Sequence, residues 1–198
     1  MNLANKLTIF RIILVPIMVI IPFLGIQGEF LGLPNTYWLI NLVFIIASIT
    51  DKLDGYIARK RNEITTFGKF ADPLADKILV LSAMIMLVEM SKLPAWIPII
   101  VIAREFIVSG YRLIAVEKGG KVIAASIWGK LKTVTQMFAV ILAYLDINAF
   151  GACFTGANLT GASLYINIAQ TVLMSASVVA TIFSGYDYLK NGKDLLKD

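Results

Sequence analysis

Four aspartates in one short stretch of the chain are the residues best suited to chemistry. Asp51 and Asp54 are three residues apart, and Asp72 and Asp76 are four apart. On helices each pair would share one face, and a short turn between two antiparallel helices would bring the pairs together. Converging carboxylates at a partly dry site cannot all stay ionised without cations. Two hard divalent ions, Mg²⁺ or Mn²⁺, would resolve the repulsion and leave positions for substrate phosphates.

Each aspartate pair also has an ordinary structural interpretation. An isolated Asp-x-x-Asp-Gly sequence is often a helix end, a turn or a fragment of a calcium loop. Asp72 followed by Pro73 is typical of a helix start, with Asp as the N-cap and Pro at the first position. The joint arrangement favours function, because ionisable residues are costly in a membrane span. Small residues nearby would let a bulky substrate approach the backbone, namely Gly55, Ala58 and Gly68.

The composition excludes several other chemistries and indicates a membrane protein. The chain has no histidine and one cysteine, Cys153, which removes histidine acid–base catalysis, Cys/His zinc sites and an intramolecular disulfide. Of its 198 residues 58% are hydrophobic and 16% are charged, against roughly 45–50% and ~25% in soluble domains. A surplus of this size needs a bilayer as solvent for part of the surface.

The apolar stretches predict an all-α domain over residues 1–198 with six transmembrane helices. They lie at about 7–26, 37–58, 73–90, 95–116, 127–145 and 164–189. No small-residue cleavage site follows the first, so we expect a retained span. Of the 18 basic residues only Lys92 falls in a connection on the side opposite to the others. The positive-inside rule therefore predicts that both termini are cytoplasmic.

Two further features have simpler interpretations than binding sites. The net charge of +5 follows from this topology, and no basic patch interleaved with aromatics suggests nucleic acid. Two five-residue repeats begin at Thr155 and Thr160 and end at Leu164. They resemble a piece of a pentapeptide solenoid, but such folds need several stacked repeats, so a loop of small residues is favoured.

Basic residues in the second half of the chain could bind a phosphate. Arg104 lies deep in the fourth predicted span, and Arg112 is about two helical turns further on. Arginine suits a phosphate monoester by its fork geometry and lysine as a point charge. Glu105 or a backbone carbonyl could instead neutralise Arg104. For Lys130 and Lys132 the positive-inside pattern is nearly as good an explanation.

The aspartate segment resembles the signature of the CDP-alcohol phosphatidyltransferase family. The pattern is Asp51-x2-Asp54-Gly55-x2-Ala58-Arg59-x8-Gly68-x3-Asp72-x3-Asp76, with no position missing. The resemblance implies that all four aspartates bind metal, with two ions of Mg²⁺ or Mn²⁺, and that Asp76 is also the general base. It further implies that the CDP-linked lipid is bound by residues around the cluster: Thr8, Arg11, Gly55, Ala58, Arg59 and Gly68.

The wider chain resembles the bacterial branch of that family that makes phosphatidylglycerophosphate. The shared features include Asn5-x-Leu7-Thr8-x-x-Arg11, Arg104-Glu-Phe, Gly129-Lys-Leu-Lys-Thr133 and Ser184-Gly-Tyr-Asp. This branch uses CDP-diacylglycerol and sn-glycerol 3-phosphate and releases CMP. The resemblance implies a homodimer in a bacterial plasma membrane with its active site at the cytoplasmic face. The acceptor phosphate would then be bound by Arg104, Arg112, Lys130 and Lys132.

Other functions are compatible with the same aspartates. A cardiolipin or phosphatidylserine synthase of this family would share them and differ in the acceptor pocket. An intramembrane prenyltransferase also has two aspartate motifs, but these usually lie far apart in sequence. An ion-coupled transporter could use intramembrane acids, yet no repeat relates the two halves of this chain.

Overall fold

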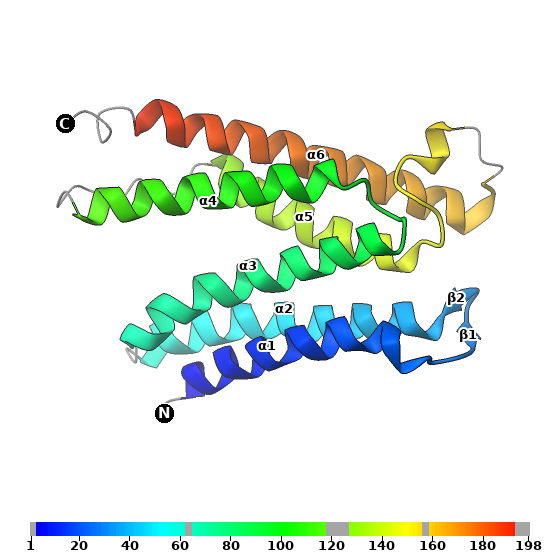
Figure 1. Ribbon diagram of the computed structural model, residues 1–198, viewed down its shortest axis with the longest axis horizontal. Helices are drawn as coiled ribbons and strands as arrows, with labels where there is room; N and C mark the ends of the chain where they lie inside the picture. The colour runs from blue at the N-terminus through cyan, green and yellow to red at the C-terminus, as the bar shows by residue number, and fades with distance from the viewer. Residues whose placement is uncertain (1–2, 62–64, 118–126, 156–158, 193–198) are drawn as a thin grey trace. The chain divides into compact units, whose positions relative to one another are not determined.

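The computed structural model describes residues 3–61, 65–117, 127–155 and 159–192. These residues are chiefly helical, which confirms the predicted fold class (Figure 1). The described α-helices, in chain order, are α1 (Leu3–Ile20), α2 (Asn35–Arg61), α3 (Thr66–Glu89), α4 (Trp96–Glu117), α5 (Ile127–Leu145) and α6 (Gly161–Asn191). The connections hold two 3₁₀ helices, η1 (Ile21–Leu24) and η2 (Ala152–Phe154), and an antiparallel pair of two-residue strands, β1 (Glu29–Phe30) and β2 (Leu33–Pro34).

The start of α3 differs from the sequence-based expectation. The helix begins at Thr66, and the hydroxyl oxygen of Thr65 caps it by accepting the backbone N–H of Gly68 at 3.0 Å. Pro73 lies inside the helix. The interpretation of Asp72 as an N-cap is therefore wrong, because Thr65 already supplies the cap almost two turns earlier. Asp72 is a helical residue that projects its carboxylate from within α3.

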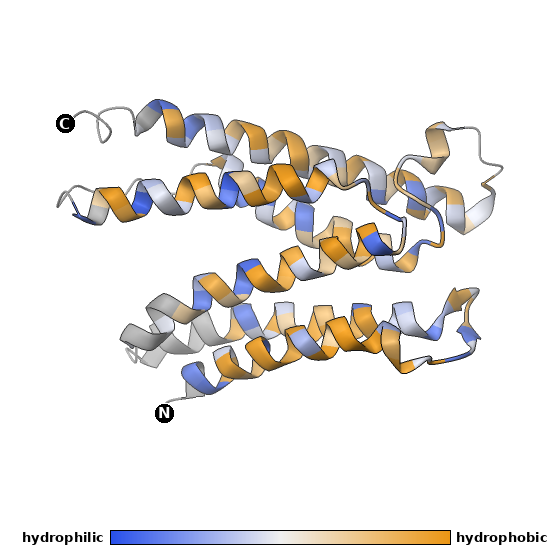
Figure 2. Cartoon of the chain, in the orientation of Figure 1, coloured by the Kyte–Doolittle hydropathy of each residue, from blue (hydrophilic) through white to orange (hydrophobic). Residues whose placement is uncertain are grey.

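The described helices differ in how apolar their sequences are (Figure 2). Among the described residues, Asn5–Leu24 and Gly161–Lys190 have both the length and the apolar composition of a membrane span. Figure 2 shows α1 apolar over most of its length, whereas hydrophilic positions interrupt the apolar sequence of α4. The sequence of α4 contains Arg104, Glu105 and Arg112. The apolar helices agree with a membrane protein, and the six-span layout stays a prediction.

The chain divides into two compact units. The first comprises Met1–Lys92 with Ala143–Asn148, and in it α1 packs against both α2 and α3. Its core is apolar and includes the fully buried Met18, Phe44 and Met84. The Tyr144 hydroxyl donates to the backbone carbonyl of Ala83 at 2.8 Å, which joins the end of α5 to α3.

The second unit comprises Leu93–Leu142 with Ala149–Asp198, and in it α4 packs against α6. The packed face of α6 is unusually polar, with the apolar Met174 in the middle of these buried polar residues: Asn167, Gln170, Thr171, Ser177, Thr181 and Ser184. Buried Ser, Thr, Asn and Gln side chains can link helices inside a membrane, where apolar packing gives no hydrophobic driving force. This polar face leads towards the basic residues described below.

Lys92, the basic residue predicted on the side opposite to the others, has a structural role. It lies in the connection between α3 and α4, and only 4% of its surface is exposed. Its ammonium donates to the backbone carbonyls of Ala143 and Asp146 at the end of α5 and lies 3.8 Å from the centre of the Tyr37 ring. Burial lowers the pKa of Lys92 to about 8, although Asp146 acts in the opposite direction. This lysine is a structural cap on a helix C-terminus.

Candidate active site

The N-terminal part of α1 holds two of the signature aspartates in place. The Thr8 hydroxyl donates to Oδ1 of Asp72 at 2.6 Å, and Nη1 of Arg11 lies 2.7 Å from Oδ1 of Asp51. Thr8 and Arg11 are three residues apart, so they share one face of α1. That face reaches α3 through Thr8 and α2 through Arg11. One helix thus connects the two aspartate pairs that the sequence placed on separate helices.

The Arg11–Asp51 pair combines a buried cation with an accessible anion. The Arg11 side chain is fully buried, whereas 30% of the Asp51 side chain is exposed. A guanidinium at this distance stabilises the ionised carboxylate and reduces its repulsion with neighbouring acids. Asp51 can therefore stay charged in a partly dry setting and still be reached from outside.

Gly68 lies at the centre of a group of oxygen atoms. A Cβ atom at this position would lie 3.2 Å from the Thr65 hydroxyl, 3.4 Å from Oδ1 of Asn5 and 3.4 Å from Oδ2 of Asp72. The Thr65 hydroxyl itself donates to Oδ1 of Asn5 at 2.8 Å. A side chain at Gly68 would therefore crowd the Asp72 carboxylate. This is a physical reason for glycine at one of the predicted lipid-binding positions.

The remaining signature positions are placed by the backbone. Asp76 is half-buried on α3, one turn after Asp72. Asp54 lies on α2, one turn after Asp51, but its side chain is outside the described residues. Gly55, Ala58 and Arg59 follow on α2, and their surroundings also lie outside the described part.

The donor chemistry of the described aspartates fits a hard divalent cation. Asp51, Asp72 and Asp76 offer carboxylate oxygens and are partly exposed, and Mg²⁺ and Mn²⁺ prefer such ligands. Among the described side chains no group of three or more acids or other metal-ligating residues is close enough to hold an ion. The four-aspartate site therefore stays a prediction that includes Asp54.

A second polar cluster lies in the other unit and is predominantly basic. Oε1 of Glu105 accepts from Nη1 of Arg104 at 2.8 Å and from Nζ of Lys132 at 2.6 Å. Nη2 of Arg104 donates to the Ser184 hydroxyl at 2.6 Å. Gly129 lies beside this guanidinium, since a Cβ added there would be 3.5 Å from Nη2 of Arg104. The cluster joins α4, α5 and α6.

The other two residues of the predicted basic set, Arg112 and Lys130, are both exposed. Arg112 is an exposed residue whose Nη2 donates to the Tyr188 hydroxyl at 2.9 Å. Lys130 is exposed on α5, and Lys132 is the lysine that reaches Glu105. Arg104, Arg112 and Lys132 carry three positive charges and Glu105 one negative charge, a net charge of +2 that matches a phosphate monoester dianion.

Sequence reasoning missed the roles of Thr65 and Tyr188 and the bond from Lys132 to Glu105. Thr65 had a readable signal, because a threonine before a helical stretch is a common N-cap. Tyr188 is four residues after Ser184, so a helical reading of α6 places both on one face. Glu105 was considered as a neutraliser of Arg104, but its bond to Lys132 joins helices distant in sequence and had no sequence signal.

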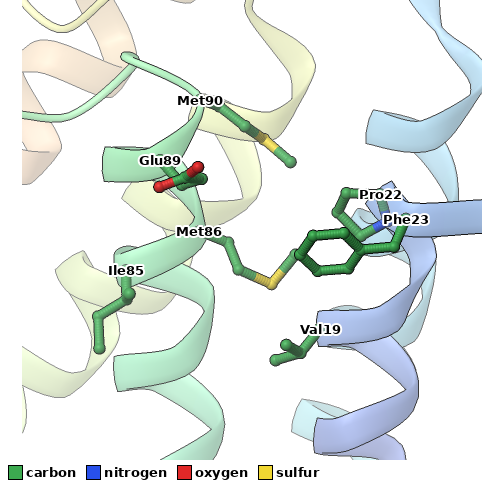
Figure 3. A pocket seen from close by; sticks show the side chains of 7 residues that line it. All are labelled: Val19, Pro22, Phe23, Ile85, Met86, Glu89 and Met90. Carbon is green, nitrogen blue, oxygen red and sulfur yellow. The ribbon is translucent and has the colours of Figure 1, made fainter.

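An apolar groove at the far end of α1 is not part of this chemistry. Figure 3 shows it between Phe23 of η1 and Met86 of α3, and its volume is about 490 Å³. Its lining is apolar except for Glu89, and no basic residue contributes to it: Val19, Pro22, Phe23, Ile85, Met86, Glu89 and Met90. A diphosphate could not be neutralised there. The groove is eight or more residues along α1 from Thr8 and Arg11.

Comparison with known proteins gives one consistent result. The family model for CDP-alcohol phosphatidyltransferases matches residues 1–183. A Bacillus subtilis protein named CDP-diacylglycerol–glycerol-3-phosphate 3-phosphatidyltransferase is 41% identical, over 99% of this chain and 97% of its own. A Haemophilus influenzae protein of the same name is 38% identical, over 100% and 96%. A Mycobacterium tuberculosis protein, named a probable phosphatidylglycerophosphate synthase, is 36% identical over 95% and 80%.

Proposed function

The chain belongs to the CDP-alcohol phosphatidyltransferase family, and we propose that it transfers the phosphatidyl group of CDP-diacylglycerol to sn-glycerol 3-phosphate. The observation that carries this proposal is 41% identity, over nearly the whole of both chains, to a relative named for that reaction. In the reaction the acceptor oxygen forms a bond to the lipid-side phosphorus, and the bond from that phosphorus to CMP breaks. The products are phosphatidylglycerophosphate and CMP.

The four aspartates would provide the metal site. Divalent-metal dependence is general in this family, and Asp51, Asp54, Asp72 and Asp76 would hold two ions, Mg²⁺ or Mn²⁺. Bound metal would supply charge neutralisation at the diphosphate. Arg11 and Thr8 support the proposal because they fix one oxygen of Asp51 and one of Asp72. Preorganised carboxylates need little rearrangement when the substrate binds.

Asp76 would act as the general base. A carboxylate can take the acceptor proton because that proton is lost in the transition state. Asp76 lies on the same helix and one turn from Asp72, whose position is fixed from α1. The CDP-lipid would be bound by small and basic residues around this helix pair, Gly55, Ala58, Arg59 and Gly68. The predicted Thr8 and Arg11 are buried and would act through the aspartates that they contact.

The basic cluster would bind the phosphate of the acceptor. Arg104, Arg112, Lys130 and Lys132 are the proposed residues, and three of them are supported by their bonds to neighbouring side chains. Burial strengthens such contacts, because only 13% of the Arg104 side chain and 10% of the Lys132 side chain are exposed. An acceptor without a phosphate would bring no anion to offset the net positive charge of these residues.

The membrane setting is also part of the proposal. We infer six spans with both termini and the active site at the cytoplasmic face of a bacterial plasma membrane, because all basic connections except that of Lys92 fall on one side. The capping role of Lys92 gives a structural reason for a lysine on the other side. A homodimer is expected from the family resemblance.

The test is CMP release by the purified protein with CDP-diacylglycerol and Mg²⁺ or Mn²⁺. Glycerol 3-phosphate, phosphatidylglycerol and serine serve as separate acceptors, and Asp76→Asn serves as the inactive variant. We expect turnover with glycerol 3-phosphate that is lost in the variant and in a chelator. Glu117→Gln, which replaces an exposed carboxylate on α4 outside the quoted motifs, is the matched control and should keep activity.

The other outcomes separate the alternatives. Turnover with phosphatidylglycerol or serine instead would keep the aspartate chemistry and assign another synthase of the family. If no CMP is released with any acceptor, and a cooperative thermal unfolding transition shows that the protein is folded, the proposed transfer reaction is overturned. An ion-coupled transporter, considered from the carboxylates alone, cannot release CMP.

A further inference from the structure

Tyr188 lies between the two arginines of the basic cluster. Its ring centre is 5.8 Å from the guanidinium carbon of Arg104 and 5.7 Å from that of Arg112. Its hydroxyl accepts from Nη2 of Arg112 at 2.9 Å. The side chain is almost completely buried, with 1% of its surface exposed. A cation near an aromatic ring within about 6 Å is attracted by it, and burial strengthens the attraction.

The arrangement solves a spacing problem within α4. Arg104 and Arg112 are eight residues apart, so their Cα atoms are separated by about 12 Å along the helix. One small anion can be contacted by both only if their long side chains converge. Arg104 is held from the other side by Ser184 and Glu105. Arg112 is exposed, and Tyr188 is the side chain to which its guanidinium is bonded in the structure.

We propose that Tyr188 is a positioning residue that orients Arg112 towards Arg104, so that both guanidinium groups meet the phosphate monoester of the acceptor. The aromatic ring attracts both cations and keeps them from drifting apart into solvent. The hydroxyl selects one orientation of Arg112. Without Tyr188, the acceptor phosphate would have to order an exposed arginine when it binds, and that ordering costs affinity.

This inference rests on the proposed function, because it takes glycerol 3-phosphate as the acceptor. It makes a prediction that a general structural role does not make. Tyr188 should affect the KM for the phosphorylated acceptor and leave kcat and the KM for CDP-diacylglycerol nearly unchanged. A packing defect in α6 would lower stability and affect all three.

The experiment measures both KM values, kcat and thermal unfolding for Tyr188→Phe and Tyr188→Leu. Tyr188→Phe keeps the ring, and we expect its KM for glycerol 3-phosphate to rise about 5-fold through loss of one charged hydrogen bond. Tyr188→Leu also loses the attraction of the ring, and we expect a rise of about 20-fold or more. The matched controls are Tyr165→Phe and Tyr165→Leu, since Tyr165 lies on the same helix and is 73% exposed.

A double-mutant cycle with Arg112→Gln tests the route of the effect. If Tyr188 acts through Arg112, adding Tyr188→Phe to Arg112→Gln should raise the KM no further. Additive effects of the two substitutions, or equal losses in kcat and both KM values, would overturn the inference. If the wild-type protein turns over glycerol 3-phosphate and the Tyr188 variants have the same KM for it, only the positioning role is refuted. Wild-type protein without such turnover would refute the proposed acceptor instead.

Discussion

In each unit a described residue of opposite charge contacts residues of a predicted site, which we call the acidic cluster (Asp51, Asp72 and Asp76) in the first unit and the basic cluster (Arg104, Arg112 and Lys132) in the second. In the first unit the aspartates are accompanied by Arg11, whose guanidinium lies 2.7 Å from Asp51. In the second unit the basic residues are accompanied by Glu105, which bonds Arg104 and Lys132. The single opposite charge reduces repulsion at short range, where a low dielectric makes it strong.

The two counter-charges differ in what they leave accessible. Arg11 is fully buried and contacts Asp51, while the aspartate stays 30% exposed. Glu105 is as buried as the residue it holds, since 13% of its side chain and 13% of that of Arg104 are exposed. The acidic cluster thus presents its charges outward from a buried support. In the basic cluster Arg104, Glu105 and Lys132 are mostly buried and Arg112 is exposed, so an anion could meet Arg112 before it reaches the buried cations.

Replacing the counter-charge of the acidic cluster should give the largest effect. Arg11→Met keeps most of the volume but removes the guanidinium that lies 2.7 Å from Asp51. Breaking a buried ion pair costs about 3–5 kcal/mol, and the exposure of Asp51 reduces this to about 2 kcal/mol. We expect kcat to fall by about 30-fold if this loss appears in the transition state, measured by CMP release, and the temperature of unfolding to drop.

Lys6→Met is the matched control for Arg11→Met, because Lys6 is an exposed cation on the same helix. It should change neither activity nor stability appreciably. Retention of wild-type kcat in Arg11→Met would show that the aspartates are organised without α1, and the comparison of the two clusters would fail.

Replacing the counter-charge of the basic cluster should give a smaller and more selective effect. Glu105→Gln keeps the shape of the side chain, but Arg104 and Lys132 then repel each other without an anion between them. Hydrogen bonds to charged groups contribute about 1.5–3 kcal/mol each, part of which the acceptor phosphate restores. We expect the KM for glycerol 3-phosphate to rise about 10-fold, with the KM for CDP-diacylglycerol unchanged.

Glu117→Gln, at an exposed position on the same helix, controls for loss of a negative charge on α4. A lower KM in Glu105→Gln would contradict the prediction, because it would mean that Glu105 competes with the phosphate instead of positioning the cations.

The smallest predicted effect concerns one hydrogen bond in the acidic cluster. Thr8→Val is nearly isosteric and removes the 2.6 Å bond to Asp72. If the bond contributes about 1.4 kcal/mol to transition-state stabilisation by orienting Asp72, kcat falls tenfold without it. Steady-state CMP release at saturating substrates measures this kcat. Thr50→Val is the control, since among the described contacts the Thr50 hydroxyl donates to carbonyls of its own helix, those of Ile46 and Ala47. An equal loss in both variants would assign the effect to helix stability.

The sequence alone determined the features that depend on spacing within one segment. Apolar composition predicted helices, and three- and four-residue spacing placed Asp51 with Asp54 and Asp72 with Asp76 on shared faces. These predictions need only the period of the α-helix. The start of α3 was misplaced because Asp72-Pro73 and Thr65 both carry start signals, and local chemistry does not say which one is used.

The tertiary structure decided which residues support the two clusters. Thr8 meets Asp72 across 64 positions, Lys132 meets Glu105 across 27, and Arg112 meets Tyr188 across 76. Such pairs depend on how each helix is rotated and packed against its neighbours. A repeating pattern along one helix fixes a face but not the face that it meets, so these contacts could not be predicted from spacing.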